Sequence, residues 1–416
     1  MKIAIVGAGI IGVTTAWELA SDGHEVTVFE RRGAAAEESS FANAGVVAPG
    51  YVTPWAAPGM RMKVLRSLLS THGAIKVRWP LAARDLRWMS HWQRACRLET
   101  YLANRARMQR LAFYSRTRLH EITEARELSY ERSDGYLVLL RSRRERKLVQ
   151  PGLDVLRNAG SVFREIDAEE ARRIEPALST DTDLAGAIHL PDDEVANCRQ
   201  FALLLKREAE ALGAQFHFNC DIAPLSRAAP RSLALAGGSD AIAYDAVVVC
   251  AGVASSALLR PLGIRMPLAP VYGHSVTAQI REPLNAPRSA VMDERYKVAI
   301  SRMGLRVRVA GSAEIGGHAD SMNPNALQTL YKVLHDWFPG AATLQTGVQQ
   351  WKGARPMLPD GPPVIGPSGV PGVWLNLGHG SSGWALSCGS ARVLADLVAG
   401  QDAGIDLEGL GIERLL

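Results

Sequence analysis

A glycine-rich turn near the N-terminus constrains the fold of this chain most strongly. The segment Gly7–Gly12 (GAGIIG) follows a predicted strand over residues 2–6 and opens a predicted helix over 10–20. Glycines at this spacing allow a tight turn, a close approach of a pyrophosphate to the backbone, and close packing of helix on strand. A second predicted strand over 24–30 ends at Glu30, which is placed to accept hydrogen bonds from a ribose hydroxyl. The chain therefore opens as a dinucleotide-binding βαβ unit.

The residues after Glu30 bear on which dinucleotide is bound. Arg31 and Arg32 would suit a phosphorylated ribose, but Glu30 would repel that phosphate, so NADP is discounted. The glycine motif alone does not separate FAD from NAD. An NAD-dependent dehydrogenase therefore stays open at this point.

Three later segments favour FAD. The loop 39–45 (SSFANAG) offers small residues and hydroxyls to phosphate and flavin. The apolar run 246–250 predicts a buried parallel strand, and Ala251-Gly252 after it gives a second close backbone approach. The segment 378–383 (GHGSSG) opens the last helix, whose N-terminus would stabilise negative charge on the N1/C2 carbonyl edge of a reduced flavin. The residues expected to contact the cofactor are Gly7, Gly9, Ile10, Ile11, Gly12, Glu30, Arg31, Arg32, Ser39, Ser40, Asn43, Ala44, Gly45, Val46, Ile222, Ala251, Gly252, Gly378, His379, Gly380, Ser381, Ser382 and Gly383.

The remaining pattern predicts two interleaved domains, because 416 residues exceed one small core. The stretch from about 60 to 126 has no strand signal and predicts helices, whereas 262–311 alternates and predicts an antiparallel sheet. The expected fold class is α/β, with a doubly wound FAD-binding Rossmann-type domain interleaved with an α+β substrate domain carrying that sheet. Further strands are expected at 135–140 and 215–218, and further helices at 141–158, 167–174, 201–212, 326–337 and 384–399. The expected FAD-binding domain comprises 1–60, 192–262 and 345–416, and the substrate domain 61–191 and 263–344.

Cysteine usage and the N-terminal sequence bear on the compartment. The five cysteines are scattered without a CxxC pair, so neither a disulfide framework nor a metal site such as zinc is expected. The N-terminus lacks the basic, apolar and small-residue pattern of a signal peptide, and no apolar run is long enough to span a bilayer. We therefore expect a cytoplasmic protein.

A basic stretch from Arg61 to Arg118 holds fourteen Lys and Arg against two acids, Asp85 and Glu99. Arginine mixed with tryptophan would suit an anionic membrane surface. A solvated helical surface with its tryptophans in the core explains the composition of this stretch equally simply, and we favour this second interpretation. No nucleic-acid motif accompanies the charge, so nucleic acid is not an expected partner. The tryptophans in or beside the stretch are Trp55, Trp79, Trp88 and Trp92.

Four segments give the chain a family resemblance that extends over nearly its whole length. Asn43–Gly59, Asp293–Lys297, Arg355–Gly361 and Gly378–Trp384 resemble the bacterial FAD-dependent D-amino acid dehydrogenases of the small-subunit type. Those enzymes share a flavin fold with D-amino acid oxidase, glycine oxidase and sarcosine oxidase. The resemblance implies noncovalent FAD, oxidation of D-amino acids to imino acids that hydrolyse to 2-oxo acids, and electrons passed to a respiratory or quinone-type acceptor at the inner face of the bacterial inner membrane. The flavin-linking cysteine of sarcosine oxidases is not matched, since 353–360 contains no Cys.

The resemblance also identifies a substrate-binding arginine. In the related oxidases, the arginine of a Gly-x-Arg-Pro motif grips the substrate carboxylate, and Gly353-Ala354-Arg355-Pro356 matches that motif. A planar guanidinium holds a carboxylate bidentately, which fixes the substrate's orientation. Our hypothesis is that Arg355 anchors the carboxylate while hydride leaves Cα for flavin N5. The side chains expected to line the pocket, position the substrate or handle protons are Tyr51, Tyr272, His274, Tyr296 and His379.

One departure from the family pattern leaves the substrate open. The dehydrogenases usually carry a basic residue at the position of Tyr272 and commonly an aromatic one at that of His274. An oxidase or dehydrogenase of glycine, sarcosine or a cyclic amine such as D-proline or hydroxy-D-proline is therefore an alternative. A flavin-carrying electron-relay subunit of a multi-chain complex is an alternative of another class.

Overall fold

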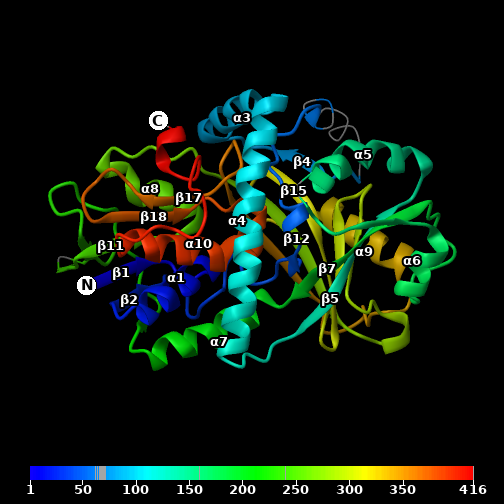
Figure 1. Cartoon of the computed structure of the whole chain (residues 1–416), viewed down its shortest axis with the longest axis horizontal. Coiled ribbons are helices and arrows are strands. Elements are labelled where there is room, and N and C mark those ends of the chain that lie inside the picture. Colours follow the sequence, from blue (N-terminus) through cyan, green and yellow to red (C-terminus); the bar gives the residue numbers. More distant parts are fainter. Residues whose placement is uncertain (61, 63, 65–71, 159, 239, 416) are drawn as a thin grey trace.

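The computed structural model describes residues 1–60, 62, 64, 72–158, 160–238 and 240–415 (Figure 1). Two sheets stand on either side of the long helix α4 (Leu98–Ala125), which crosses the middle of the molecule. The N-terminal strands lie in the sheet on one side, and most strands from the middle of the chain lie in the other.

The first sheet has six strands in the order β17-β18-β11-β1-β2-β8. All neighbouring pairs are parallel except the edge pair β17–β18, which is antiparallel. The central strands β1 and β11 are almost wholly buried, because helices or loops cover both faces. This is the expected doubly wound arrangement. The strand bounds are β1 (Lys2–Val6), β2 (Glu25–Phe29), β8 (Gln215–His217), β11 (Ala246–Val249), β17 (Val364–Pro367) and β18 (Val373–Leu377).

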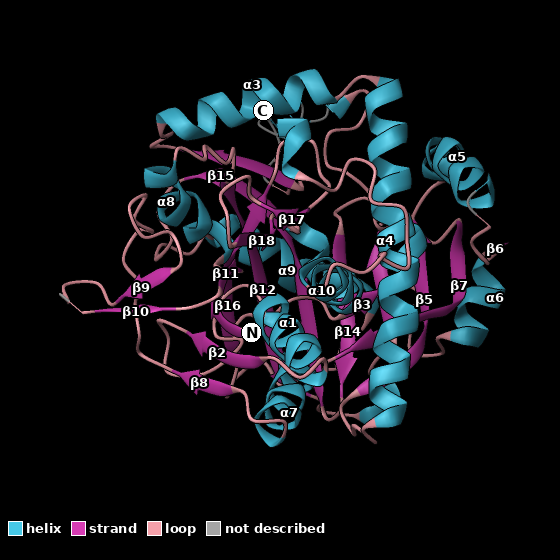
Figure 2. Ribbon diagram, turned by 60° about the vertical axis from the view of Figure 1, so that its left-hand side comes forward, coloured by secondary structure: helices cyan, strands magenta, loops and turns pink. Residues whose placement is uncertain are grey.

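Helices from distant parts of the chain pack around this sheet (Figure 2). Helix α1 (Ile10–Ser21) contacts α7 (Cys198–Ala211) and α10 (Gly383–Val398), and α10 in turn contacts α4. Because α1 is enclosed, its Glu18 is fully buried, and Arg118 and Arg392 neutralise it with N···O distances of 2.8 Å each.

The second sheet has ten strands, eight of them in the order β16-β12-β15-β14-β13-β5-β7-β3. Helix α9 (Pro324–Trp337) packs on β12 and β15, and its Leu330, Val333 and Trp337 form a core with the sheet. Strand β16 belongs to this sheet, although it falls in the segment 345–416 that the sequence assigned to the FAD-binding domain. The bounds are β3 (Val46–Val47), β5 (Arg132–Leu140), β7 (Gly186–Ala196), β12 (Ala269–Gln279), β13 (Ala290–Asp293), β14 (Val298–Met303), β15 (Arg306–Gly316) and β16 (Gln349–Met357).

Two short strands complete the second sheet, and one of them corrects an expectation. The stretch 60–126 was expected to be helical throughout, yet β4 (Ile75–Arg78) pairs in parallel with β15. Four residues are too few to give a readable alternation, so only the pairing with β15 reveals this strand. Strand β6 (Arg164–Ile166) pairs with β7. The remaining elements are α3 (Ala83–Ala95), α5 (Arg143–Asn158), α6 (Ala168–Ile174), α8 (Ser255–Leu259), α9 (Pro324–Trp337) and the hairpin β9 (Ser232–Ala234) with β10 (Ala241–Ala243).

The basic stretch divides into a neutralised and an exposed part. Arg61, Lys63 and Arg66 lie outside the described residues. Trp88 and Trp92 are buried and stacked, with ring centroids 6.2 Å apart, as the core interpretation expects. Across the described ranges, no helix combines the length and apolar character needed to cross a membrane. The α4 arginines that pair with acids elsewhere in the chain are Arg107 with Glu408, Arg110 with Asp406, Arg116 with Asp193 and Arg118 with Glu18.

Candidate active site

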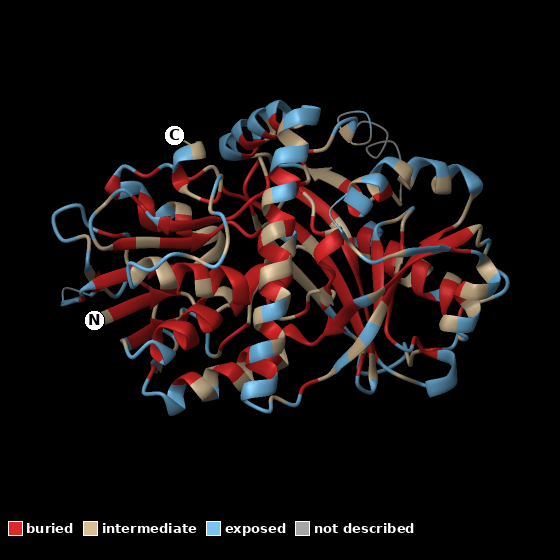
Figure 3. Ribbon diagram, in the orientation of Figure 1, coloured by how far each residue is buried: buried red, intermediate tan, exposed pale blue. Residues whose placement is uncertain are grey.

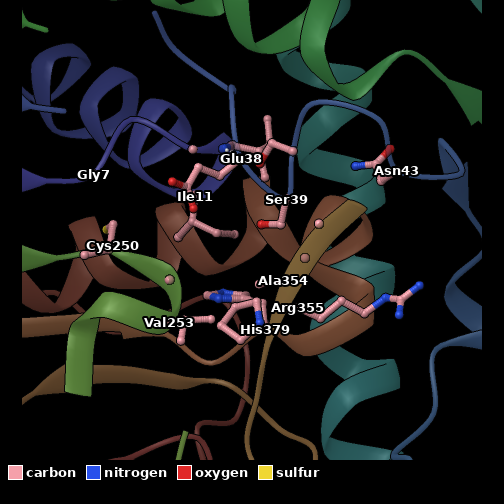
Figure 4. A pocket seen from close by; sticks show the side chains of 18 of the residues that line it. Gly7, Ile11, Glu38, Ser39, Asn43, Cys250, Val253, Ala354, Arg355 and His379 are labelled. Atoms are coloured by element: carbon pink, nitrogen blue, oxygen red, sulfur yellow. Dashed lines mark hydrogen bonds between the residues drawn. The ribbon is translucent and has the colours of Figure 1, made fainter. Parts of the chain in front are cut away.

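A cavity of about 790 Å³ lies between the two sheets and collects most of the residues singled out from the sequence (Figure 4). Gly7, Ile11 and Ser39 lie on one side of it, and Arg355 and His379 lie on the other. The predicted residues that line it are Gly7, Gly9, Ile10, Ile11, Glu30, Arg31, Ser39, Ser40, Asn43, Ala44, Gly45, Val46, Ile222, Ala251, Gly252, His274, Arg355, Gly378, His379, Gly380, Ser381, Ser382 and Gly383. The predicted residues that do not line it are Gly12, Arg32, Tyr51, Tyr272 and Tyr296.

The glycine turn has the close packing that a dinucleotide site requires. Gly7 has φ of 105°, and a Cβ there would lie 2.7 Å from the carbonyl oxygen of Cys250. A Cβ on Gly12 would lie 1.8 Å from the carbonyl oxygen of Gly7, so Gly12 acts by close packing and not by facing the cavity. The turn thus brings bare backbone and the N-terminus of α1 to the cavity, which fits a pyrophosphate.

Glu30 faces the same end of the cavity from the end of β2. Its Oε2 accepts a hydrogen bond from the Ala8 backbone N–H at 2.7 Å, and its Oε1 accepts one from that of Arg32 at 2.9 Å. Each carboxylate oxygen keeps a further lone pair for a ribose hydroxyl. Arg31 and Arg32 both form ion pairs with Glu38, with N···O distances of 2.6 and 2.8 Å. The two cations that would attract a ribose phosphate are therefore already paired with a carboxylate.

The loop after β2 joins the glycine turn to the second sheet. Ser40 Oγ accepts a hydrogen bond from the Ile10 N–H at 3.0 Å, at the start of α1. The carbonyl oxygen of Ala44 accepts one from Ser301 Oγ at 2.8 Å, and that of Asn43 accepts one from Arg308 Nη1 at 3.1 Å. The loop therefore joins the two halves of the molecule beside the cavity.

The C-terminal glycine segment brings a helix N-terminus to the cavity, as expected. Gly378 and Gly380 have φ of 80° and 57°, and α10 begins at Gly383. His379 lies between them, but its Nε2 is 3.0 Å from Ser390 Oγ, and burial lowers its pKa to about 3. This imidazole is therefore neutral near pH 7 and already hydrogen bonded, and its role in positioning or proton handling stays a prediction.

Arg355 enters the cavity from β16, where its backbone pairs with Val271 of β12. Its Nη1 donates to the carbonyl oxygen of Ser312 at 3.0 Å, and burial lowers its pKa to about 10, so the group is cationic at neutral pH. Among the described residues, no carboxylate forms an ion pair with it. A buried cation without a counterion favours binding of an anion, and a guanidinium suits a carboxylate in particular.

Three tyrosines expected at the site lie elsewhere. Tyr272 alternates with Gly273 along β12 and faces away from the cavity, where its ring lies 4.4 Å from Lys352 Nζ. Tyr296 packs its ring against Arg141 and Lys332.

Tyr51 is half-buried behind the cavity wall, edge-on to Tyr136 with centroids 6.1 Å apart. Desolvation raises the pKa of Tyr51 well above its usual range, so its phenol stays protonated.

Several lining residues were not identified from the sequence. Tyr136 and Met292 come from β5 and β13, and Lys297 is the last residue of the turn before β14, with φ of 53°. That turn brings Lys297, and not Tyr296, to the cavity. The strand alternation of β5 could have revealed Tyr136, but the turn carries no such signal. Other missed lining residues include Glu38, Val253, Ala254, Ala299, Ala310, Gly311 and Trp351.

Comparisons with known proteins agree with this geometry. Residues 2–397 match the family described as FAD dependent oxidoreductase. The chain is 42% identical over 416 residues to a D-amino acid dehydrogenase of Cereibacter sphaeroides, a match that covers 100% of this chain and 95% of that protein. It is also 42% identical to a D-amino acid dehydrogenase of Rhizobium johnstonii, with 100% of both chains covered. The crystal structure of glycine oxidase from Geobacillus kaustophilus shares the fold, with a TM-score of 0.75 at 21% identity over 99% of this chain and 98% of that one.

Proposed function

Since this chain belongs to the family of FAD-dependent oxidoreductases, we propose that it is a D-amino acid dehydrogenase that oxidises its substrate to an imino acid. The observation that carries the substrate class is Arg355, a cavity-facing guanidinium with no carboxylate partner among the described residues. The cavity also runs without a break from the glycine turn to this arginine, so cofactor and substrate would share one space.

The chain's own residues supply binding and orientation. The glycine turn, Glu30 and the N-terminus of α10 would hold FAD noncovalently, and FAD when bound takes the two electrons of the Cα–H bond as a hydride. Arg355 holds the carboxylate, which directs Cα toward the middle of the cavity. His274 and His379 are weak bases, because burial lowers the pKa of these side chains to about 4 and about 3. The substrate ammonium would therefore lose its proton to water, and the imino acid would hydrolyse to a 2-oxo acid after release.

Replacing Arg355 tests the carboxylate assignment. Arg355→Met should lower kcat/KM by about 100-fold, because the substrate carboxylate loses its charged hydrogen bonds. The flavin content of the purified protein should stay unchanged, since Arg355 stands apart from the glycine turn. An unchanged KM with full flavin occupancy would refute the assignment.

We propose a quinone-type acceptor of the respiratory chain for the electrons. The names of the relatives, which are dehydrogenases and not oxidases, support this proposal. The test compares hydrogen peroxide formation with reduction of a soluble quinone during turnover of one D-amino acid. Quinone reduction should be at least tenfold faster than peroxide formation, and the reverse ratio would make the protein an oxidase. No flavin reduction by any amino acid would instead favour an electron-relay subunit.

We also propose that the outward face of α3 rests on an anionic membrane. Leu86, Arg87 and Arg94 lie along the exposed side of this helix, opposite the buried Trp88 and Trp92 (Figure 3). Trp79, just before the helix, is 79% exposed. Arg87 and Arg94 form no ion pair with any described residue, unlike Arg107, Arg110, Arg116 and Arg118 of α4. Exposed arginine beside exposed tryptophan and leucine suits an anionic lipid surface.

A vesicle assay tests this face. The protein should sediment with vesicles containing anionic lipid, less so at high salt, and the double variant Arg87→Glu/Arg94→Glu should remain in the supernatant. The control Arg207→Glu/Arg227→Glu makes the same charge change; Arg207 lies on α7, at the opposite end of the molecule from α3 (Figure 1). Equal loss of sedimentation in both variants would indicate a general charge effect and contradict the proposal.

A further inference from the structure

The strands behind Arg355 are irregular at one point. Along the β12–β15 pair, Tyr272 pairs with Glu314 but His274 pairs with Gly311. One residue of β12 therefore stands opposite two residues of β15, Ser312 and Ala313, which is the pattern of a β-bulge. Bulges re-aim backbone groups, and this one lies directly beneath the substrate arginine.

The bulge holds Ser312 in a conformation that serine rarely adopts. Its φ is 58°, in the left-handed region, which costs a residue with a Cβ roughly 1–2 kcal/mol. In this conformation its carbonyl oxygen accepts the 3.0 Å hydrogen bond from Arg355 Nη1. Its side chain is held as well, because Ser312 Oγ lies 2.9 Å from His274 Nδ1. Such strain persists only where the surroundings fix the residue from several sides.

His274 is itself fixed from behind. The backbone N–H of Asn323, the residue that caps α9, points to His274 Nε2 at 3.4 Å. That contact makes Nε2 the acceptor nitrogen, so Nδ1 carries the proton and donates to Ser312 Oγ. Asn323 is anchored in turn through Nδ2, which donates to Glu314 Oε2 at 2.6 Å, while Lys352 donates to Glu314 Oε1 at 2.6 Å. Burial lowers the pKa of His274 to about 4, with Lys352 acting in the same direction and Glu314 opposing it, so the imidazole is neutral at neutral pH.

Space for the guanidinium comes from Gly273. A Cβ on this residue would lie 2.3 Å from Arg355 Nη2 and 2.5 Å from its Cζ, so the guanidinium lies directly over the glycine. The Ser312 carbonyl occupies one donor nitrogen, and no described residue accepts from Nε or Nη2. The free donors of the fork are therefore available to a ligand in the cavity.

We propose that His274 is a positioning residue for the substrate carboxylate. By holding Ser312 in its left-handed conformation, it keeps the carbonyl on Arg355 Nη1 and the other guanidinium donors aimed at the substrate. The inference rests on the proposed function of Arg355 as the carboxylate-binding group. It adds a residue that acts on the substrate through Ser312 and Arg355.

A double-mutant cycle between His274 and Arg355 tests the proposal, with kcat/KM for the D-amino acid that reduces the flavin fastest as its readout. His274→Leu should lower kcat/KM about tenfold through KM, with kcat changed less than threefold. His274→Asn, whose side-chain amide can still donate to Ser312, should recover most of the loss. In the Arg355→Met background, His274→Leu should have no further effect, because the group it positions is absent.

The control is His72→Leu. His72 also pairs with a hydroxyl, Thr329 Oγ1 at 2.9 Å, but it does not line the cavity, so kcat/KM should stay unchanged. Equal tenfold losses from His274→Leu in the wild-type and Arg355→Met backgrounds would overturn the positioning role. So would an unchanged kcat/KM in His274→Leu, or loss of bound flavin in His274→Asn. If Arg355→Met itself leaves kcat/KM unchanged, the proposed carboxylate site fails; if only His274→Leu is silent, the positioning role alone fails.

Discussion

The two ends of the cavity are built in different ways. At the cofactor end, short segments such as Gly7–Gly12 and Gly378–Gly383 present backbone and helix N-termini. At the substrate end, Arg355, Ser312 and His274 come from three different strands and meet only because of sheet register and one bulge. Local sequence thus determines the first end, and long-range pairing determines the second. Substitutions at the two ends should therefore fail in different ways.

The largest expected effect is loss of the cofactor. In Gly12→Ala, the new Cβ would lie 1.8 Å from the Gly7 carbonyl oxygen, so the turn and α1 cannot keep their packing. We expect purified Gly12→Ala to hold less than a tenth of the wild-type flavin, measured as the ratio of visible flavin absorbance to protein absorbance. Gly152→Ala is the control, because a Cβ at Gly152 on α5 meets no atom of the described residues within 4 Å. Full flavin occupancy in Gly12→Ala would show that the turn is not the nucleotide cradle.

A second prediction concerns the geometry of the substrate cation. Arg355→Lys keeps the charge but loses the planar fork that can bind both carboxylate oxygens. We expect kcat/KM to fall about 30-fold, between wild type and Arg355→Met, with flavin content unchanged. Steady-state kinetics with a saturating soluble acceptor gives this number. Recovery of wild-type kcat/KM by lysine would mean that charge alone, and not the fork, binds the substrate.

A smaller effect should follow from filling the space under the guanidinium. Gly273→Ala places a Cβ 2.3 Å from Arg355 Nη2, and the long side chain can give way by moving. We expect KM to rise about tenfold, because the guanidinium is displaced. A tenfold rise corresponds to a loss of about 1.4 kcal/mol in binding free energy. Flavin content should not change, in contrast with the same substitution at Gly12. If Gly273→Ala also lost flavin, the two ends would not be separable.

A last effect concerns stability and not catalysis, because the second sheet carries buried acids. Asp193 on β7 is 5% exposed, and desolvation raises its pKa to about 7. The unfolded chain releases this proton near pH 4, so the folded state binds it more tightly between about pH 4 and 7. Stability should therefore fall as pH rises through that window, by about 2 kcal/mol between pH 5 and 7.5 from this group.

Denaturant unfolding at the two pH values measures this dependence. Asp193→Asn should show a flatter dependence on pH than the wild type, with flavin content unchanged. A wild-type protein that became more stable from pH 5 to 7.5 relative to Asp193→Asn would reverse the sign and contradict the assignment.

The difference between the two ends of the cavity also explains which elements of the fold could be predicted from the sequence. The βαβ start, the buried strand β11 and the helix α10 were predicted because each has a local signature of glycines or continuous apolar residues. Strand β7 was not assigned, because Pro191 and the acidic residues Asp192–Glu194 interrupt its apolar pattern. Strand β4 was missed because it is four residues long.

At the proposed substrate end, the sequence predicted a cavity-lining arginine but not its surroundings. The Gly-x-Arg-Pro motif identified Arg355, yet Tyr272 faces the opposite side of β12, since neighbouring residues of a strand point to opposite faces. Lys297 reaches the cavity in place of Tyr296, because Lys297 itself adopts a left-handed backbone conformation in the turn. The role inferred for His274 depends on a bulge that no local pattern encodes.

Anaerobic titration of the purified flavoprotein with matched D- and L-amino acids tests the central claim most directly. We expect D-amino acids to abolish the visible flavin absorbance at concentrations at least 100-fold below those of their L-enantiomers. Arg355→Met should require about 100-fold more of the same D-amino acid while holding the same amount of flavin. Reduction by L-enantiomers at equal or lower concentrations, or reduction of Arg355→Met at the wild-type concentration, would contradict the account.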